Sequence, residues 1–464
     1  MAALRQRDGK DYQRTKRSTG GLEIETMNLP NTWKSELLEN YMVKGGGNVD
    51  PSKYPNEQFD LYSIPAYDSQ FPEIARGSEI GSTKKIVKEN DILLSRIVPH
   101  IQRSWVVGRD VGRRQIGSGE WMIFRGESFI PKYMRYFLLS YDFHMKLMTT
   151  ISGVGGSLTR ATPTLVGKFT VPLPPLPEQR RIVAKIEELF SSLDKGIESL
   201  KTAQQQLKVY RQAVLKWAFE GRLTNPDVKD GELPKGWKLE MLVDVAEKIA
   251  DGEHFRPKTQ STGVPFLSAK DVRDAGVSFD DPLYISDQTA KKAMQRCNPE
   301  IGDILIVSRG ATVGRMCIVK TERKFCLLGS VILIKVKKTL NSQYLTYALK
   351  SPSINQKLIS LSGATAQQAI YLRDIKNIEI PIPPAIEQHA IVAEIESRLS
   401  VCDKIEESIE ESLRQAEALR QSILKKAFEG KLVPQNPNDE PASKLLEHIK
   451  AQKEKTVGTK RSKN

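Results

Sequence analysis

The chain contains the sequence Pro172-Leu-Pro-Pro-Leu-Pro-Glu-Gln-Arg-Arg-Ile-Val-Ala184 and repeats it as Pro381-Ile-Pro-Pro-Ala-Ile-Glu-Gln-His-Ala-Ile-Val-Ala393. A second pair of matching segments follows, Arg211-Gln-Ala-Val-Leu-Lys-Trp-Ala-Phe-Glu-Gly-Arg-Leu223 and Arg420-Gln-Ser-Ile-Leu-Lys-Lys-Ala-Phe-Glu-Gly-Lys-Leu432. Both pairs are 209 residues apart (381 − 172 and 420 − 211), so no insertion separates them. A repeat of constant length predicts a duplicated helix that has to stay in register.

Length and composition limit the class of protein. A chain of 464 residues is too long to fold around one hydrophobic core, and the duplication predicts two similar halves. No apolar run is long enough to cross a bilayer, and no apolar segment follows the basic N-terminus, so we expect a cytoplasmic protein without contact to a membrane. The net charge of +14 favours nucleic acid as the partner. Four separated cysteines and five scattered histidines predict neither disulfides nor a metal site.

The region between the motifs predicts a long helix in each half. Apolar residues recur at near-heptad spacing, which is typical of a coiled coil. A Pro-rich segment leads into each helix, and Gly221 or Gly430 is placed to cap its end. A helix from 178 to 221 would be about 65 Å long. The predicted seam consists of Ile182, Ile186, Leu189, Leu193, Ile197, Leu200, Leu207, Val214 and Trp217 in the first helix, and of Ile391, Ile395, Cys402, Ile405, Ile409, Leu413, Leu419 and Ile423 in the second.

Short β-branched runs that alternate with Gly-rich turns predict a mixed α/β domain before each helix. The fold class is therefore α+β, with two similar α/β domains separated by two long antiparallel coiled-coil helices in a pseudo-two-fold repeat. Two domains that the helices hold at a fixed distance could each contact one half-site of a DNA duplex. The expected segments are a flexible basic tail at 1–26, domain 1 at 27–177, helix 1 at 178–223, a linker at 224–236, domain 2 at 237–386, helix 2 at 387–432 and a mostly flexible basic tail at 433–464.

This doubled order of domains and motifs resembles the specificity subunit of type I restriction-modification systems, over residues from about 27 to 432. The resemblance implies that the two domains are target-recognition domains, each reading one half of a bipartite, asymmetric target in double-stranded DNA. It implies that the paired helices dock two methyltransferase subunits, and it allows two restriction subunits in the assembly. No catalytic residue and no cofactor is expected in this chain, because S-adenosylmethionine, ATP and Mg²⁺ would bind to the partner subunits.

Two loops of each domain carry the candidate DNA contacts, because base reading needs Arg, Lys, Asn or Gln on an element that enters a groove. One loop directly follows a strand and the other is rich in glycine or small residues. Arg96 and Arg309 have an alternative interpretation as ion-paired framework residues. The candidates are Arg96, His100, Gln102, Arg103, Ser157, Thr159 and Arg160 in domain 1, and Arg309, Thr312, Arg315, Thr365, Gln367 and Gln368 in domain 2.

The segment Ala250-Asp-Gly-Glu-His-Phe-Arg-Pro257 resembles a common opening of target-recognition domains, which adds His254, Arg256 and Lys258 to the DNA candidates. Domain 1 departs from it with Val43-Lys-Gly-Gly-Gly-Asn48. Recurrence of the helix ends predicts subunit docking by Arg211, Gln212, Phe219, Glu220, Arg420, Gln421, Phe428 and Glu429, with helix termination and packing as the alternative.

Two other classes of function stay open. A self-contained DNA methyltransferase or nuclease would need its own site, for which Asp303 with Glu322 and Lys324 is a candidate, although such acid and lysine patterns are common in charged sequences. The sequence contains no G-x-x-x-x-G-K-[ST] motif for ATP hydrolysis. A coiled-coil scaffold that binds only proteins is the other alternative.

Overall fold

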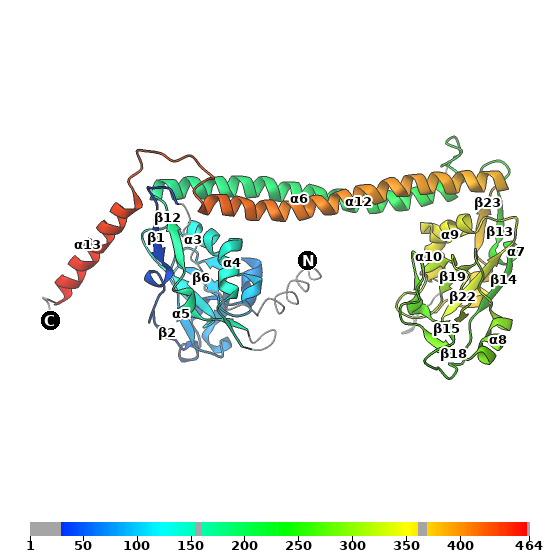
Figure 1. Cartoon of the computed structure of the whole chain (residues 1–464), viewed down its shortest axis with the longest axis horizontal. Coiled ribbons are helices and arrows are strands. Elements are labelled where there is room, and N and C mark those ends of the chain that lie inside the picture. Colours follow the sequence, from blue (N-terminus) through cyan, green and yellow to red (C-terminus); the bar gives the residue numbers. More distant parts are fainter. Residues whose placement is uncertain (1–28, 154–158, 230, 361–368, 462–464) are drawn as a thin grey trace. The chain divides into compact units, whose positions relative to one another are not determined.

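The computed structural model describes residues 29–153, 159–229, 231–360 and 369–461. The chain divides into two compact units: unit 1 contains residues 1–197 and 414–464, and unit 2 contains residues 198–413. Two helices, α6 (Leu176–Phe219) and α12 (Ala385–Phe428), each have 44 residues and pass from one unit into the other (Figure 1). Both end just before a glycine in the left-handed region, Gly221 with φ 80° and Gly430 with φ 74°, rather than at the expected residues 223 and 432.

Unit 1 contains a five-stranded sheet in the order β2-β5-β8-β3-β4 and a three-stranded sheet in the order β7-β6-β9. The strands of these sheets are β2 (Asn48–Val49), β3 (Gln58–Tyr62), β4 (Glu73–Arg76), β5 (Lys84–Ile86), β6 (Ile92–Ser95), β7 (Ser104–Val106), β8 (Arg114–Gly117) and β9 (Trp121–Phe124). Two further pairs are β1 (Lys34–Leu37) with β12 (Thr170–Leu173) and β10 (Ile151–Ser152) with β11 (Arg160–Ala161). The helices are α3 (Pro131–Leu138), α4 (Tyr141–Met148), α5 (Pro163–Val166) and α13 (Ala442–Arg461).

Unit 2 has a four-stranded sheet in the order β14-β22-β19-β20 and a three-stranded sheet in the order β18-β15-β21. These strands are β14 (Ala246–Asp251), β15 (Val264–Leu267), β18 (Leu283–Ile285), β19 (Ile304–Val307), β20 (Met316–Ile318), β21 (Cys326–Leu327) and β22 (Val331–Val336). Unit 2 also contains two two-stranded pairs: β13 (Lys238–Met241) with β23 (Glu379–Ile382), and β16 (Val272–Arg273) with β17 (Gly276–Val277). The helices are α7 (Leu242–Val245), α8 (Asp287–Arg296), α9 (Ser342–Lys350), α10 (Pro352–Ser360) and α11 (Leu372–Lys376).

Each core is built from one domain, the start of one long helix and the end of the other. In unit 1, Ile182 and Ile186 of α6 are buried together with Phe428 of α12. In unit 2, Ile391 of α12 is buried together with Val214 of α6. The start of one helix therefore lies beside the end of the other within each unit, which confirms antiparallel pairing and the predicted fold class.

The helix seam differs from the predicted stripe at three residues. Trp217, Ile405 and Leu419 are 38%, 43% and 52% exposed, whereas Val214 and Ala218 of α6 are buried. Val214 belongs to the predicted stripe and is buried as expected, whereas the next buried position is Ala218, one residue after the predicted Trp217. A straight α-helix drifts relative to a strict seven-residue repeat, which moves such positions out of the seam.

The segment after residue 432 is more ordered than the flexible tail that we expected. Leu432 and Val433 pack against the core of unit 1, and the Ala442 amide donates to Thr32 O at 3.0 Å before α13 begins. Arg181 of α6 forms a 2.6 Å ion pair with Asp439, whose side chain is only 8% exposed. These contacts attach the segment after residue 432 to unit 1.

Among the described residues, no helix is sufficiently long and apolar to traverse a lipid bilayer. The four cysteines carry free thiols and are buried.

Candidate nucleic-acid interface

In unit 1 the structure brings the two candidate loops together. The first loop follows β6 and contains Arg96 to Arg103, and the second candidate segment ends at Thr159 and Arg160. A bridge joins Ile97 to Arg160, and the Val98 amide donates to Thr159 O at 3.0 Å. Two segments that are about sixty residues apart in the chain therefore form one surface.

Unit 2 repeats this arrangement. Here the loop follows β19, and Arg309 bridges Ala369 as Ile97 bridges Arg160. The Ile370 amide donates to Ser308 O at 2.8 Å, as the Ala161 amide donates to Arg96 O at 2.7 Å. The equivalence of backbone contacts establishes that Arg96 corresponds to Ser308 and Arg160 to Ala369. The predicted match between the loop after β6 and the loop after β19 is confirmed, with different side chains on a common framework.

The two loops also share an unusual backbone. Val98 and Gln102 have positive φ angles of 47° and 52°, and unit 2 has glycines in the corresponding places, Gly310 with φ 100° and Gly314 with φ 83°. A β-branched residue in the left-handed region is a strained outlier that surrounding contacts must hold. In unit 1 the Gln102 amide supplies such contacts by donating to Ser140 O at 3.1 Å and Leu138 O at 3.4 Å.

The candidates of the first loop have distinct environments. Gln102 holds the loop to the neighbouring helices, so the structure gives its amide nitrogen a framework role instead of the predicted base contact. The Nε atom of Arg103 is buried and finds no hydrogen-bond partner within the described residues. His100 is exposed at the tip of the loop. Arg96 and Arg160 both face Glu120, with closest N–O distances of 3.5 and 3.0 Å.

In unit 2, Arg309 and Arg315 are exposed and Thr312 is half-buried in the turn between them. Four predicted DNA-binding residues lie outside the described residues: Ser157, Thr365, Gln367 and Gln368.

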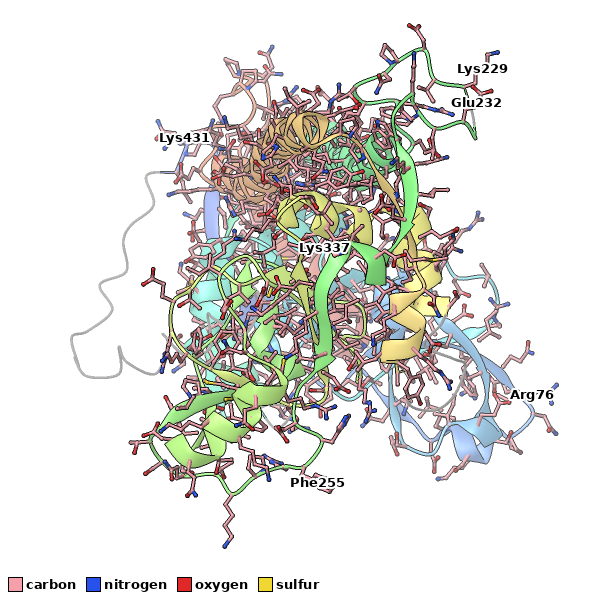
Figure 2. All side chains as sticks on the ribbon, turned by 90° about the vertical axis from the view of Figure 1, so that its right-hand side faces the viewer. Arg76, Lys229, Glu232, Phe255, Lys337 and Lys431 are labelled. Carbon is pink, nitrogen blue, oxygen red and sulfur yellow. The ribbon has the colours of Figure 1, made fainter. Side chains whose placement is uncertain are left out.

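The loop after β14 presents a second basic surface of unit 2. Phe255 at its tip is 87% exposed (Figure 2), and Arg256 and Lys258 are exposed beside it. His254 is held at the base of the loop, where its Nε2 lies 3.2 Å from Asp251 Oδ2 and 2.8 Å from an Arg296 nitrogen. His254 thus orients the loop, while Arg256 and Lys258 are available for a partner.

The predicted docking residues fall into two groups. Phe219 and Phe428 are buried, and they meet Tyr344 and Tyr133 at ring-centroid distances of 5.2 and 5.3 Å. Their predicted docking role is wrong, because both rings fill the core of a recognition domain. Sequence reasoning had assigned them to a surface since the recurrence of a motif does not distinguish docking from packing.

The charged candidates hold the helices to each other. Arg211 donates to Asp403 at 2.7 Å in unit 2, and Arg420 pairs with Asp194 in unit 1. The two pairs are equivalent, because Asp403 and Asp194 differ by the same 209 residues (403 − 194). Glu220 and Glu429 lie near Arg222 and Lys431 on their own helix ends. Gln212 is exposed and Gln421 is half-buried.

The Pro-rich motifs fix each domain to its helix, a role that sequence reasoning missed. Trp33 Nε1 donates to Glu178 Oε1 at 3.1 Å, and Trp237 Nε1 donates to Glu387 Oε2 at 3.0 Å. The neighbouring glutamines are buried, and each accepts from a backbone amide at 2.8 Å: Gln179 from Ile130, and Gln388 from Asn341. The recurrence of Leu-Pro-x-x-Trp-Lys before each domain was the signal that could have located the tryptophan partner.

The chain is similar to known proteins of type I restriction-modification systems. The family model for the type I restriction modification DNA specificity domain matches residues 234–415. The EcoBI type I restriction enzyme specificity subunit of Escherichia coli is 32% identical over 318 residues, which cover 63% of this chain and 66% of that protein. The chain belongs to the family of type I restriction-modification specificity subunits.

Further members of the family share the sequence and the fold. The EcoKI specificity subunit of Escherichia coli K12 is 28% identical over 322 residues, covering 66% of this chain and 69% of that protein. A chain from a solved structure of a type I restriction-modification system, studied for complex assembly and conformational transition, superposes with a TM-score of 0.70 at 26% identity and covers 87% of this chain and 99% of that one. The crystal structure of the HsdS subunit from Thermoanaerobacter tengcongensis superposes with a TM-score of 0.59 at 26% identity, over 87% of this chain and 98% of that one.

Two acidic residues of this specificity subunit form ion pairs at the starts of strands. Asp303 lies at the start of β19 and pairs with Lys335 at 2.8 Å, and Asp91 at the start of β6 pairs with Arg125 at 2.6 Å. Asp303 accordingly contacts Lys335 rather than the Glu322 and Lys324 of the nuclease alternative. Within the described residues, no cluster of three His, Cys, Asp or Glu side chains is positioned to hold a metal ion.

Proposed function

We propose that this chain is the DNA-reading subunit of a type I restriction-modification complex and that it performs no chemistry itself. Each unit would read one half of a bipartite target in double-stranded DNA. The observation that carries the proposal is the equivalent loop pair in the two units, with shared backbone contacts and different side chains. Phosphate contacts by Lys and Arg position such a loop, while its remaining side chains select bases.

Exchange of one recognition domain tests this function. We would replace residues 27–171 by the corresponding domain of another specificity subunit and map the methylated adenines in DNA that the complex has modified. The expected result is a new sequence in one half-site and an unchanged second half-site. An unchanged target would refute the proposal. The matched control replaces residues 237–380 instead, for which only the other half-site should change.

The partners in this proposal are two methyltransferase subunits that bind the helix pair, together with restriction subunits where the system has them. S-adenosylmethionine, ATP and Mg²⁺ would be held by those partners. The purified chain incubated with DNA, Mg²⁺ and S-adenosylmethionine should accordingly give neither methyl transfer nor cleavage. Either activity would favour a self-contained DNA enzyme. If the affinity of the complex for DNA did not change with salt concentration, the alternative of a coiled-coil scaffold that binds only proteins would be favoured, because phosphate contacts make DNA affinity fall as salt rises.

We propose that a methyltransferase subunit docks on exposed apolar side chains of the helix pair. In unit 2, Tyr210 and Trp217 are seven residues apart on one side of α6, and both are more than a third exposed. Val401 of α12 is 55% exposed, one turn from Arg398, which lies close to Tyr210. We take these three exposed side chains as the docking site, because exposed aromatic residues are frequent anchors of protein interfaces.

Docking is tested with Tyr210→Glu and Trp217→Glu in the complete complex. The expected result is a loss of methyltransferase subunit from the complex in size-exclusion chromatography, with the fold intact by circular dichroism. Lys216→Glu, on the same helix, is the matched control for added negative charge. Full retention of both methyltransferase subunits by the two aromatic variants would remove this surface from the proposal.

A further inference from the structure

The loop after β14 leaves the sheet of unit 2 at the same edge as the loop after β19. β14 and β19 lie on either side of β22, and both run antiparallel to it. Asp251 at the end of β14 pairs with Ile332, and Val307 at the end of β19 pairs with Val331. The two loops therefore begin at neighbouring points of one sheet edge.

The segment 328–330 lies between these two loops. On one side, the Gly329 amide donates to Glu253 O at 2.8 Å. On the other side, Ser330 O accepts from the Ser308 amide at 2.8 Å. The base of the loop after β14 is thus fixed beside the loop that carries the candidate DNA contacts of unit 2.

Further contacts at both ends hold the loop and neutralise its acidic residues. Arg296 of α8 forms an ion pair with Asp251, and it lies near enough to Glu253 to interact with that charge. At the far end of the loop, the Gln260 amide donates to Tyr284 O at 3.0 Å. The charge that remains at the tip between these anchors is positive.

The tip combines an exposed aromatic ring with two free cations. Phe255 is 87% exposed (Figure 2). Arg256 and Lys258 are exposed, and neither forms an ion pair or a side-chain hydrogen bond with any part of the chain that the structure describes. A single exposed apolar residue is common on protein surfaces. A ring beside unpaired cations, however, is complementary to a duplex, which has phosphates outside and stacked bases inside.

Unit 1 has a different loop at the corresponding place. β9 of unit 1 corresponds to β22, because each pairs with the strand that precedes the candidate loop. Met42 bridges Phe124 of β9 as Ile249 of β14 pairs with Ile334 of β22. The chain of unit 1 then continues as Val43-Lys-Gly-Gly-Gly-Asn48, which contains no aromatic residue. The aromatic tip of this loop is therefore a feature of unit 2.

We propose that Phe255 inserts between two base pairs of the half-site that unit 2 reads, while Arg256 and Lys258 contact the neighbouring phosphates. DNA-binding proteins insert apolar side chains into base steps in this way and partly unstack them. Pyrimidine–purine steps deform most easily, so we expect the insertion at such a step. This inference rests on the proposed DNA-reading function. It gives unit 2 a means of selecting sequence without a hydrogen bond to a base.

The test uses the complex of this chain with its methyltransferase subunits, on the target established by mapping methylated adenines. A fluorescent base analogue replaces one base of the second half-site at a time, and its fluorescence rises when stacking is lost. The methylated adenine is left out, because methyltransferases take their target base out of the stack. The unmodified complex should give a rise at one pyrimidine–purine step. Phe255→Ala should abolish this rise and weaken binding about 5- to 150-fold, the range for one base–aromatic stacking contact.

Three further variants serve as controls. Phe255→Leu keeps an apolar side chain that can enter a base step, so it should retain most of the fluorescence rise. Phe71→Ala makes the same substitution at a ring of unit 1 that is 75% exposed, and it should leave the fluorescence of the second half-site unchanged. Lys258→Ala should weaken binding alike on all sequences and lower the salt slope by about one. Thermal unfolding of every variant separates folding effects from DNA binding.

The outcomes are distinguishable. If the unmodified complex unstacks no base besides the methylated adenine, or if Phe255→Ala keeps the fluorescence rise, the inference is overturned and the proposed function stands. Release of a methyltransferase subunit by Phe255→Ala in the absence of DNA would also overturn it, because the ring would then contact a protein. Failure of the unmodified complex to prefer any sequence would contradict the proposed function itself.

Discussion

Trp33 donates its indole N–H to Glu178 at 3.1 Å, although 145 residues separate them in the chain. Unit 2 contains the same contact between Trp237 and Glu387 at 3.0 Å. In each unit the residue that opens a recognition domain is thus tied to the first turn of the helix that follows this domain. The Glu of the repeated motif acts as an anchor for the domain, in addition to any favourable interaction with the positive end of the helix.

Glu178 predicts a specific dependence of stability on pH. Burial raises the pKa of Glu178 above its usual value of 4.5, and hydrogen bonds from Gln435 and Trp33 act in the opposite direction. Because the folded state holds this proton more tightly than the unfolded chain, the stabilisation is complete below the unfolded pKa and is lost as pH rises through the folded pKa. Glu178→Gln keeps an acceptor oxygen and carries no charge.

We therefore expect that the unfolding free energy of Glu178→Gln does not fall as pH rises through the folded pKa of Glu178. At about pH 8 it should equal or exceed the unfolding free energy of the unmodified chain. Urea unfolding at several pH values measures it. Glu187→Gln, at an exposed ion pair on the same helix, is the control. Lower stability of Glu178→Gln at about pH 8 would show that the ionised carboxylate is favourable, for example through Arg181.

Phe428 predicts a large loss of stability on truncation. The ring is buried and packs edge-on against Tyr133 and Phe137, at centroid distances of 5.3 and 5.4 Å. Phe428→Ala should cost about 3–5 kcal/mol in unfolding free energy, and Phe428→Leu should cost less because it leaves a smaller cavity. Chemical denaturation gives both values. A change below about 1 kcal/mol in Phe428→Ala would restore the docking interpretation of this residue.

The cross-helix ion pairs are expected to contribute little to stability. Arg211 is 23% exposed and Asp403 is 72% exposed, so solvent screens their attraction. A double-mutant cycle with Arg211→Gln and Asp403→Asn should give a coupling of about 0.2–1 kcal/mol that decreases with salt. The equivalent pair, Arg420 with Asp194, should behave in the same way. A coupling above about 2 kcal/mol in either pair would contradict this prediction.

Helix length predicts the spacing of the two half-sites. Insertion of seven residues into both α6 and α12, at the level where the helices pass between units, preserves the heptad pattern and adds about 10 Å. We expect the unspecified gap in the DNA target to grow by about three base pairs, since each spans about 3.4 Å. Mapping of methylated adenines measures the gap. An unchanged gap with an altered half-site would refute the spacer role of the helices.

Part of this organisation could be predicted because it depends on local patterns. The left-handed caps at Gly221 and Gly430 and the antiparallel helices follow from repeated spacing and residue type. The loops after β6 and β19 were also placed correctly, because an Arg-containing stretch that follows a β-branched run is a local signal. The exposure of Trp217 and Leu419 was not predicted, since helix drift and the position of the domain decide which side of the helix is covered.

The sequence by itself determined the duplication, the two long helices and the class of residue in the recognition loops, because periodicity and turn chemistry are encoded between near neighbours. Only the tertiary structure decided that Phe219 and Phe428 complete recognition-domain cores and that Glu120 stands between Arg96 and Arg160. Those contacts join segments from separate parts of the chain, and which distant surfaces meet depends on how the hydrophobic faces of all elements are buried together.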